Sequence, residues 1–424
     1  MTTINLDHLT KIEGHARLRI KVKKGQVEKV KLQIFEGSRY FEGILKDKKY
    51  NDLSPISSRI CGICSPVHAT TSVLAVEKCF GVQPTEQTNK LRELLIIGGM
   101  IQSHILHLYF LALPDFLGYE NALRMAKDKK NEIMTALRIK RAGNNMVNII
   151  GGRDIHPVAS ILGGFSRIPT KECVKKLIND LRVIQLDAEK TSELFYNLEI
   201  PKFEKFKEYF ALTGNNYFYS HDHINCLGDK CIPVETYEQH FKEYFREGST
   251  AEFASKETGK SYMVGAVARI INNHGLLSQD TQKYQNFIKK NKYSPFINNL
   301  SQAVEIQEGI KRSIEILESL DLKDEKPVEI IPKPGIGIAA TEAPRGILFH
   351  KYAIDEKGFC SSCNITTPTT QNLQNIEENI AAFLPTILDK PKEQVILEIE
   401  KLIRAYDPCI SCATHFLKVD WEKE

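Results

Sequence analysis

Apolar and polar positions alternate near the start of the chain. Residues 16 to 35 carry apolar side chains at every second position on both sides of Gly25, as in Leu18, Ile20 and Val22 before it. A period of two is typical of a half-buried strand, and a glycine between two such runs predicts a β-hairpin.

From about residue 85 the apolar residues recur at intervals of three and four, which is the period of a helix. Pro84 and Glu86 stand near the start of the first such stretch, 85–113. The same spacing predicts helices at 119–150, 171–198, 234–247, 279–292, 301–320, 371–387 and 391–405. Residues 213–233 are rich in turn formers, and 327–370 are irregular with short β-prone runs. We therefore expect an α+β fold that is mainly α: one domain over residues 1–424, built as a large helical bundle with small peripheral β-sheets.

The most apolar segment, 94–113, is interrupted by Gln102, Ser103, His104 and His107. Polar residues at that density make it a poor membrane span and favour a buried helix. The first fifteen residues lack a basic start followed by an apolar stretch, so no secretory signal is predicted. The pattern favours a cytoplasmic protein without a membrane span.

Composition excludes little else. Charged residues make up 26% of the chain, and the net charge of +4 is too small and too evenly spread to indicate nucleic-acid binding. Ten cysteines in such a chain are more typical of free thiols or metal ligands than of disulfides.

Two CxxC pairs carry the chemistry of interest. RICGICSPVH holds Cys61 and Cys64, and DPCISCATH holds Cys409 and Cys412 near the other end. Two cysteines three apart on a turn can converge on one metal, so the two pairs could supply four thiolates to one centre. Zinc or an iron–sulfur cluster would accept four thiolates. Structural zinc pairs usually lie some fifteen to twenty residues apart, which weakens the zinc interpretation without excluding it.

Five segments in order resemble the motifs of nickel–iron hydrogenase large subunits. They are LTKIEGHARLRI, RICGICSPVH, GGRDIHPVASILGG, EAPRGILFH and DPCISCATH, and together they span nearly the whole chain. The segment MIQSHILHLYFLALPDFLGY resembles the cytoplasmic, multi-subunit branch of that family. Enzymes of this branch pass electrons to NAD(P), to a deazaflavin or to a heterodisulfide-reducing partner.

The resemblance implies a ligand set and a reaction. Nickel would be bound by all four cysteines of the two pairs, with Cys61 and Cys409 as terminal ligands. Cys64 and Cys412 would also bridge to an iron that carries one carbon monoxide and two cyanides. The reaction implied is reversible, heterolytic cleavage of dihydrogen to two protons and two electrons. Cys409 would accept the first proton, and Glu13 in KIEGH would relay it, because a carboxylate can move protons when its surroundings tune it.

The remaining motif residues receive supporting roles from the same resemblance. Arg345 would hydrogen-bond one cyanide and Thr369 the other, and Asp115 and Asp407 would flank the arginine and offset its burial. Magnesium would be held by Glu42, His415 and the backbone carbonyl of Ile365. His68 would support a bridging sulfur. His104, His107 and His156 are assigned only hydrogen-bonding roles in the core or at the surface.

The chain beyond His415, residues 416–424, resembles the extension that a maturation protease removes once nickel is in place. The alternative is a mature enzyme that keeps this tail. The resemblance also implies metallochaperones, a small iron–sulfur subunit that takes up the electrons, and flavin- or NAD(P)-type acceptor subunits.

Two other functions stay open at this point: a structural zinc or iron–sulfur protein, and a non-catalytic hydrogenase-like subunit. A further CxxC, Cys360 and Cys363, could form a separate site with the HDHINC segment and Cys231. We prefer the simpler interpretation that the cysteines outside the two nickel motifs are small buried hydrophobic residues, namely Cys79, Cys173, Cys226, Cys231, Cys360 and Cys363.

Overall fold

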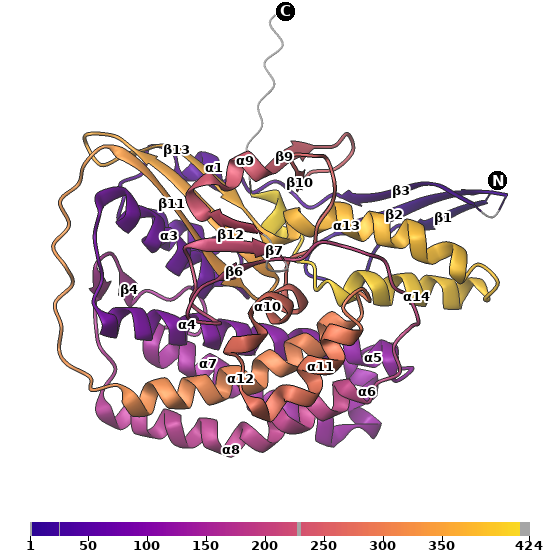
Figure 1. Cartoon of the computed structure of the whole chain (residues 1–424), viewed down its shortest axis with the longest axis horizontal. Coiled ribbons are helices and arrows are strands. Elements are labelled where there is room, and N and C mark those ends of the chain that lie inside the picture. The colour runs from indigo at the N-terminus through magenta and orange to yellow at the C-terminus, as the bar shows by residue number, and fades with distance from the viewer. Residues whose placement is uncertain (1, 25, 227–229, 416–424) are drawn as a thin grey trace, which may run out of the picture.

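Four long helices lie side by side and make up the helical body of the protein (Figure 1). The computed structural model describes residues 2–24, 26–226 and 230–415, so the predicted extension at 416–424 lies outside it. The four helices are α4 (Glu86–Leu106), α7 (Lys130–Gly151), α8 (Lys171–Tyr196) and α12 (Ile297–Ser319). Side-chain caps fix where two of them begin, since Thr85 and Thr170 accept from the amides of Thr88 and Cys173.

The helix α4 lies at the centre of this body. It continues through a π-helical turn, His107–Ala112, into α5 (Leu113–Phe116). By length and hydropathy the run Glu86–Phe116 could span a membrane, but 83% of its most apolar window is buried inside the protein. The expectation of a buried helix is therefore confirmed.

Shorter helices surround this body. They are α1 (Phe41–Leu45), α2 (Leu53–Ser57), α3 (Ser65–Phe80), α6 (Ala122–Asp128), α9 (Tyr237–His240), α10 (Ala266–Asn273), α11 (Gln282–Lys290), α13 (Pro368–Phe383) and α14 (Lys392–Ala405).

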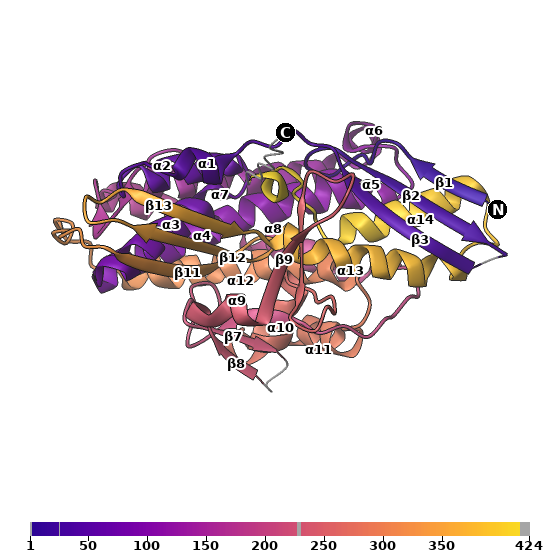
Figure 2. The same ribbon diagram turned by 90° about the horizontal axis from the view of Figure 1, so that it is seen from above.

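Small antiparallel sheets lie around the helices, as Figure 2 shows from above. The strands are β1 (Thr2–Leu6), β2 (Ala16–Lys23) and β3 (Gln26–Ile34) in one sheet, and β11 (Gly335–Ala343), β12 (Gly346–Ile354) and β13 (Cys360–Thr366) in another. Three further sheets pair β4 (Ser160–Ile161) with β5 (Gly164–Phe165), β6 (Phe210–Thr213) with β7 (His223–Cys226) and β8 (Lys230–Pro233), and β9 (Phe241–Phe245) with β10 (Glu252–Lys256).

The sheet β11–β12–β13 positions one predicted site residue directly. Ala343 pairs with Gly346, so Pro344 and Arg345 form the two-residue tip of the β11–β12 hairpin. Gly346 has a φ of 132°, and a Cβ on it would lie 2.3 Å from Val264 Cγ2, so only glycine fits after the arginine. The chain thus holds Arg345 at a tight, fixed corner.

The predicted fold class, mainly α with small peripheral sheets, is confirmed, and so is the hairpin at 16–35, which gains β1 as a third strand. The predicted helix at 234–247 is wrong. Only a 3₁₀ turn (Val234–Thr236) and the four-residue α9 form there, and Phe241–Phe245 pairs with β10 instead. The stretch 327–370 is more regular than expected, because most of it forms β11, β12 and β13.

Candidate metal centre

The two CxxC pairs meet although they lie far apart in the chain. Cys61 Sγ lies 3.7 Å from Cys409 Sγ, and Cys64 Sγ lies 3.6 Å from Cys412 Sγ. The Cys409 and Cys412 sulfurs are 2.9 Å apart. All four side chains are buried, and the sulfurs of Cys61, Cys64 and Cys412 lie within 4.8 Å of one another. Four convergent sulfurs at this spacing form a ready ligand set for a thiophilic metal.

Local structure explains why the first pair converges. Cys61 follows the 3₁₀ turn Ser58–Ile60, and Cys64 is the N-cap residue of α3. The backbone amide of Cys64 donates to Cys61 Sγ over 3.3 Å. An amide donor and the positive end of a helix both stabilise a thiolate, so this turn favours metal-binding sulfurs.

The four thiols are electrostatically unequal. Hydrogen bonds from Cys409 and Cys412 hold the pKa of Cys61 well below its usual range. Burial, together with hydrogen bonds to Cys412 and Cys61, raises the pKa of Cys409 well above it. The protein alone thus favours one thiolate in the cluster. A metal cation must supply the charge that stabilises the others, which makes binding and deprotonation one event.

A small cavity lies beside the sulfurs of Cys64 and Cys412, and its wall includes Arg345, Thr369 and His68. Arg345 Nη1 is buried without a hydrogen-bond partner among the described residues. Thr369 Oγ1 accepts from the Cys409 amide over 3.0 Å, which leaves its hydroxyl hydrogen free to donate elsewhere. Two uncommitted donors at one cavity fit small anionic ligands.

Arg345 is held by Asp407. Its Nε donates to the Asp407 carbonyl over 2.6 Å, and its Nη2 donates to Asp407 Oδ1 over 3.0 Å. Burial opposes the charge, but Asp407 and the Cys409 sulfur outweigh it and raise the pKa of Arg345 well above its usual value. The guanidinium is therefore a permanent cation next to the sulfurs.

The second carboxylate expected beside this arginine has other partners. Asp115 pairs with Arg404 and Lys11, and Arg345 has no recorded contact with it. Arg404 also donates to the Thr10 carbonyl over 2.9 Å. The expectation that Asp115 flanks Arg345 is therefore corrected: Asp115 ties α5 to the N-terminal segment and to α14.

Glu13 lies against the second cysteine pair. Cys409 Sγ donates to Glu13 Oε2 over 3.0 Å, and Ser411 donates through its amide and its hydroxyl to the same carboxylate. The backbone fixes this placement, because the Ile410 amide donates to the Glu13 carbonyl over 2.8 Å. A carboxylate in hydrogen-bond contact with a ligand thiol can exchange a proton with it.

Glu42, Ile365 and His415 converge at a second place. His415 Nε2 lies 2.5 Å from the Ile365 carbonyl oxygen and 3.7 Å from Glu42 Oε1. The Ile365 amide donates to Glu42 Oε1 over 2.8 Å. A carboxylate, a carbonyl and an imidazole gathered at one place are groups that a divalent cation can bind, and the oxygen ligands suit magnesium.

His68 belongs to a chain of buried polar groups. Its Nδ1 lies 3.2 Å from His350 Nε2, and His350 Nδ1 lies 2.7 Å from the Tyr352 hydroxyl, which donates to Ser72. Burial lowers the pKa of His68 to about 3, so the ring is neutral. The His68 ring forms part of the cavity wall and contacts His350.

The other cysteines and histidines form no further cluster. Among the described residues, three or more potential metal ligands gather only at Cys61, Cys64 and Cys412. Cys79, Cys226 and Cys360 are buried as expected, whereas Cys173 and Cys231 are exposed and do not fit the hydrophobic role. His104, His107 and His156 make hydrogen bonds, to Glu305, to Gln302 and to the Ser58 carbonyl.

Sequence reasoning missed Arg39. Its guanidinium donates to the carbonyls of Ile60 and Ser411, the residues next to Cys61 and Cys412. One side chain thus clasps the two cysteine segments together. Its only sequence signal was its position three residues before Glu42.

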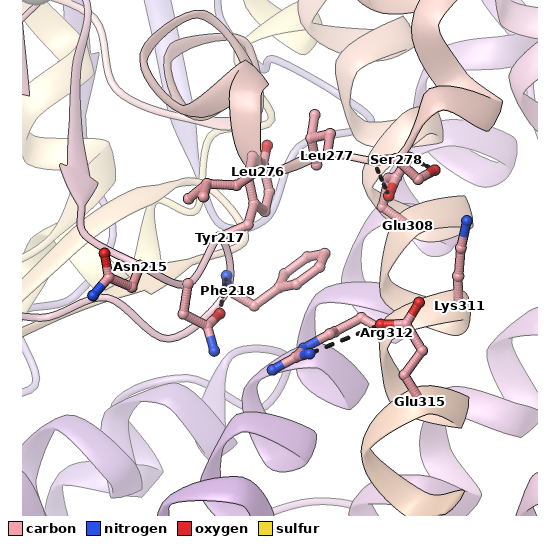
Figure 3. Close-up of a pocket in the computed structure, with 11 residues that line it drawn as sticks. Asn215, Tyr217, Phe218, Leu276, Leu277, Ser278, Glu308, Lys311, Arg312 and Glu315 are labelled. Atoms are coloured by element: carbon pink, nitrogen blue, oxygen red, sulfur yellow. Dashed lines mark hydrogen bonds and ion pairs between the residues drawn. The ribbon is translucent and has the colours of Figure 1, made fainter. Parts of the chain in front are cut away.

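A larger surface pocket lies elsewhere, between α12 and the segment 276–278 (Figure 3). Its charged groups already have partners: Ser278 donates to Glu308, and Arg312 pairs with Glu93. The pocket contains none of the cysteines.

Comparisons with known proteins agree with this geometry. The profile of the nickel-dependent hydrogenase family matches residues 39–135 and 258–415. The alpha chain of sulfhydrogenase 1 from Pyrococcus furiosus is 39% identical over 98% of this chain and 98% of its own length. An F420-non-reducing hydrogenase polypeptide from Methanothermobacter marburgensis is 30% identical over 98% of this chain and 95% of its own.

Solved structures share the fold. An NAD⁺-reducing [NiFe]-hydrogenase in its H₂-reduced state superimposes with a TM-score of 0.91, at 24% identity, over 98% of this chain and 100% of that one. A Ni-Fe-Se hydrogenase from D. vulgaris Hildenborough gives 0.80 over the same shares, also at 24% identity.

Proposed function

The chain belongs to the family of nickel-dependent hydrogenases and is a catalytic subunit of that family; from this premise we propose how its own residues divide the reaction. The bound nickel–iron group would supply an electrophilic site that polarises dihydrogen for heterolytic cleavage. The observation that carries the proposal is the convergence of Cys61, Cys64, Cys409 and Cys412 in one buried cluster. All four would hold nickel, and Cys64 and Cys412 would also hold the iron.

The proton leaves through Cys409 and Glu13. Cys409 Sγ is within hydrogen-bond distance of Glu13 Oε2, so Cys409 as a thiolate could take up a proton from the reacting site and, as the thiol, pass it to the carboxylate. Ser411 holds that carboxylate from the other side. Glu13, which is partly exposed, would then release the proton toward solvent. Proton transfer in the reverse direction would serve dihydrogen formation.

Arg345 and Thr369 orient the iron ligands. Each contributes a donor with no other recorded acceptor at the cavity beside Cys64 and Cys412. Cyanide accepts hydrogen bonds through nitrogen and carbon monoxide does so only weakly, so two donors suit two cyanides and one carbon monoxide. Asp407 offsets the charge of Arg345. Asp115 acts on the site only indirectly, through its ion pair with Arg404.

Magnesium is assigned to Glu42, the Ile365 carbonyl and His415. The ion would tie α1 and β13 to the segment that carries Cys412. His68 supports the bridging sulfur of Cys64 from the cavity wall. Both are structural aids to the sulfur cluster.

Electrons need a partner subunit with its own iron–sulfur cluster. The described residues hold one cysteine cluster, which the nickel site uses. Exposed apolar side chains lie on two segments that contact the Cys61 turn: Tyr40 and Ile44 follow Arg39, which donates to the Ile60 carbonyl, and Ile155 and Val158 lie close to His156 in sequence. His156 contacts this turn in two places: its amide donates to the Ser65 hydroxyl, and its Nδ1 lies against the Ser58 carbonyl. We assign this face to the iron–sulfur subunit, since exposed apolar patches mark interaction sites.

The wider setting follows from the same family. The Pyrococcus furiosus relative is named as the alpha component of its enzyme, and further flavin- or NAD(P)-type subunits would carry electrons onward. We place the enzyme in the cytoplasm. A maturation protease would remove residues 416–424 after metallochaperones deliver the metals.

Metal analysis with infrared spectroscopy tests the proposal. Protein matured in its native host should contain nickel and iron and show stretching bands of bound carbon monoxide and cyanide. Cys409→Ser should lose dihydrogen turnover and nickel. Zinc as the sole metal would favour a structural role instead, and nickel-free protein with an intact fold would favour a non-catalytic relative.

A further inference from the structure

One face of α12 carries three buried polar side chains that no recognised motif contains: Asn298, Gln302 and Glu305. Their spacing of four and three places them on the same side of the helix. Each contacts a segment that leads to Arg345 or to Asp407. We call this set the α12 ridge.

Gln302 contacts the carboxylate that holds Arg345. Its Nε2 donates to Asp407 Oδ2 over 3.1 Å, while Asp407 Oδ1 accepts from Arg345. The amide therefore occupies one carboxylate oxygen and leaves the other for the guanidinium. This division fixes the rotation of the carboxylate plane, and the plane sets the direction of the arginine fork.

His107 lies against the oxygen of the Gln302 amide. His107 Nδ1 lies 2.5 Å from Gln302 Oε1, and Nε2 lies 2.7 Å from the Arg404 carbonyl oxygen. Because the Asp407 carboxylate only accepts, the amide directs its nitrogen at Asp407 and its oxygen at His107. The π-helical turn that begins at His107 is the local distortion of the long helix at this contact.

Glu305 holds the other side of the hairpin tip through Arg269. Arg269 donates twice to Glu305, once to Glu342, and to the carbonyls of Ala343 and Pro344. Those carbonyls immediately precede Arg345. All five N–H groups of this buried guanidinium are used, so the backbone before Arg345 is clamped.

Asn298 completes the ridge at its other end. Its Nδ2 donates to the Ala405 carbonyl over 2.8 Å, and its Oδ1 accepts from the Val267 amide over 3.1 Å. Ala405 ends α14 and lies two residues before Asp407. The α12 ridge therefore contacts both segments that meet at the Arg345–Asp407 pair: it binds the end of α14 and Asp407 directly and the β11–β12 tip through Arg269.

We propose that Gln302 is a positioning residue for the hydrogenase reaction: through Asp407 it directs the Arg345 guanidinium so that the unpartnered Nη1 faces the cavity beside Cys64 and Cys412. The effect on the iron ligands rests on the function proposed above. The effect on Arg345 geometry does not, because every contact in the argument is between residues of this chain.

A purely structural role for Gln302 predicts a different outcome. If the amide only stabilised the core, its removal would lower the free energy of unfolding without turning Arg345. Gln302→Met separates the two, because methionine fills nearly the same volume and makes neither hydrogen bond. Gln307 lies on the same helix, has the same side chain and makes no recorded contact with Asp407, so Gln307→Met is the matched control.

The first measurement is a crystal structure of each metal-free variant. In Gln302→Met we expect Asp407 to rotate and the contact between Arg345 Nη2 and Asp407 Oδ1 to break, and in Gln307→Met we expect it to persist. An unchanged Arg345–Asp407 pair in Gln302→Met would overturn the proposal. Should Gln302→Met not fold, Gln302→Asn keeps the amide but ends one methylene short of Asp407, and the same outcomes decide.

The second measurement uses the metal-loaded enzyme. We expect Gln302→Met to retain nickel and iron, to shift the cyanide bands, and to lower kcat about tenfold to a hundredfold with the KM for dihydrogen unchanged. Wild-type bands and wild-type kcat would refute the proposal. If wild-type protein shows no such bands, the proposed function fails, and the crystal structures still decide the role of Gln302.

Discussion

At the scale of single residues, Glu13 shows how little the side-chain type alone decides. A lone glutamate between Ile12 and Gly14 is ordinarily a solvated surface charge. Here a bridge between the backbones of Glu13 and Cys409 brings the carboxylate to the Cys409 sulfur. Residue identity supplies the chemistry, and backbone pairing with a segment almost four hundred positions away supplies the place.

Glu13→Gln should retain nickel and iron but lose proton transfer. The amide keeps the size of the carboxylate and can still accept from Ser411, yet it cannot take a proton from Cys409. We expect hydrogen–deuterium exchange between D₂ and water to fall at least about a hundredfold, the usual range for a lost general acid–base group. Glu36→Gln is the control, because the Glu36 carboxylate binds His15 at the surface. This variant should exchange at the wild-type rate. Equal rates in both variants would remove Glu13 from the proton path.

At the scale of elements, the close contact between α3 and β11 places two halves of the site together. The helix begins at the Cys64 cap, and the strand leads into the Pro344–Arg345 tip. Gly337 of β11 lies so near the helix that a Cβ on it would sit 1.9 Å from the Ala75 carbonyl oxygen. The absence of a side chain there sets the spacing of the two elements.

Gly337→Ala should therefore push β11 away from α3. We expect a loss of about 3 kcal/mol or more in the free energy of unfolding, at the upper end for overpacked sites, together with a lower nickel content. Gly335→Ala is the control on the same strand, since its Cβ would meet Cys79 Sγ at 3.3 Å. Urea titration and metal analysis measure both effects. Similar losses in the two variants would show that the α3–β11 spacing does not depend on Gly337.

Elements were predictable where one period dominated the sequence. The 3.6-residue pattern located α4, α7, α8 and α12, and the alternation around Gly25 located β2 and β3. The prediction failed at 234–247 because the apolar residues of FKEYF fit the period of a strand as well as that of a helix. Pairing with β10 makes this segment a strand. The motif residues were found by resemblance, whereas Gln302, Arg269 and Arg39 were not, because their roles arise from contacts between distant segments.

At the scale of the whole molecule, the sulfur cluster joins the two ends of the fold. The Cys61 turn and the Cys409 segment are separated by 348 positions, and Arg39, Glu13 and Glu42 also link N-terminal segments to the C-terminal one. A metal bound by all four cysteines would close a loop that contains most of the chain. Closing so long a loop constrains the unfolded state strongly.

Metal removal should loosen the C-terminal segment first. We expect nickel-loaded protein to exceed metal-free protein in stability by about 4 kcal/mol, the linkage for free metal a thousandfold above its dissociation constant. Limited proteolysis should cut within 406–415 only after the metal is removed. Cys409→Ser should be cut there with or without added nickel. Identical cleavage of loaded and metal-free wild-type protein would show that the metal does not hold this segment.

The long separation between the two cysteine pairs also sets an order in time. Cys61 and Cys64 are synthesised 348 residues before Cys409 and Cys412. At roughly 5–20 residues per second, translation takes about 20–70 s to cross that interval. A growing chain holds the first pair of thiols without the second throughout this time. A metal could therefore be enclosed by four sulfurs only after the segment that follows α14 has been synthesised.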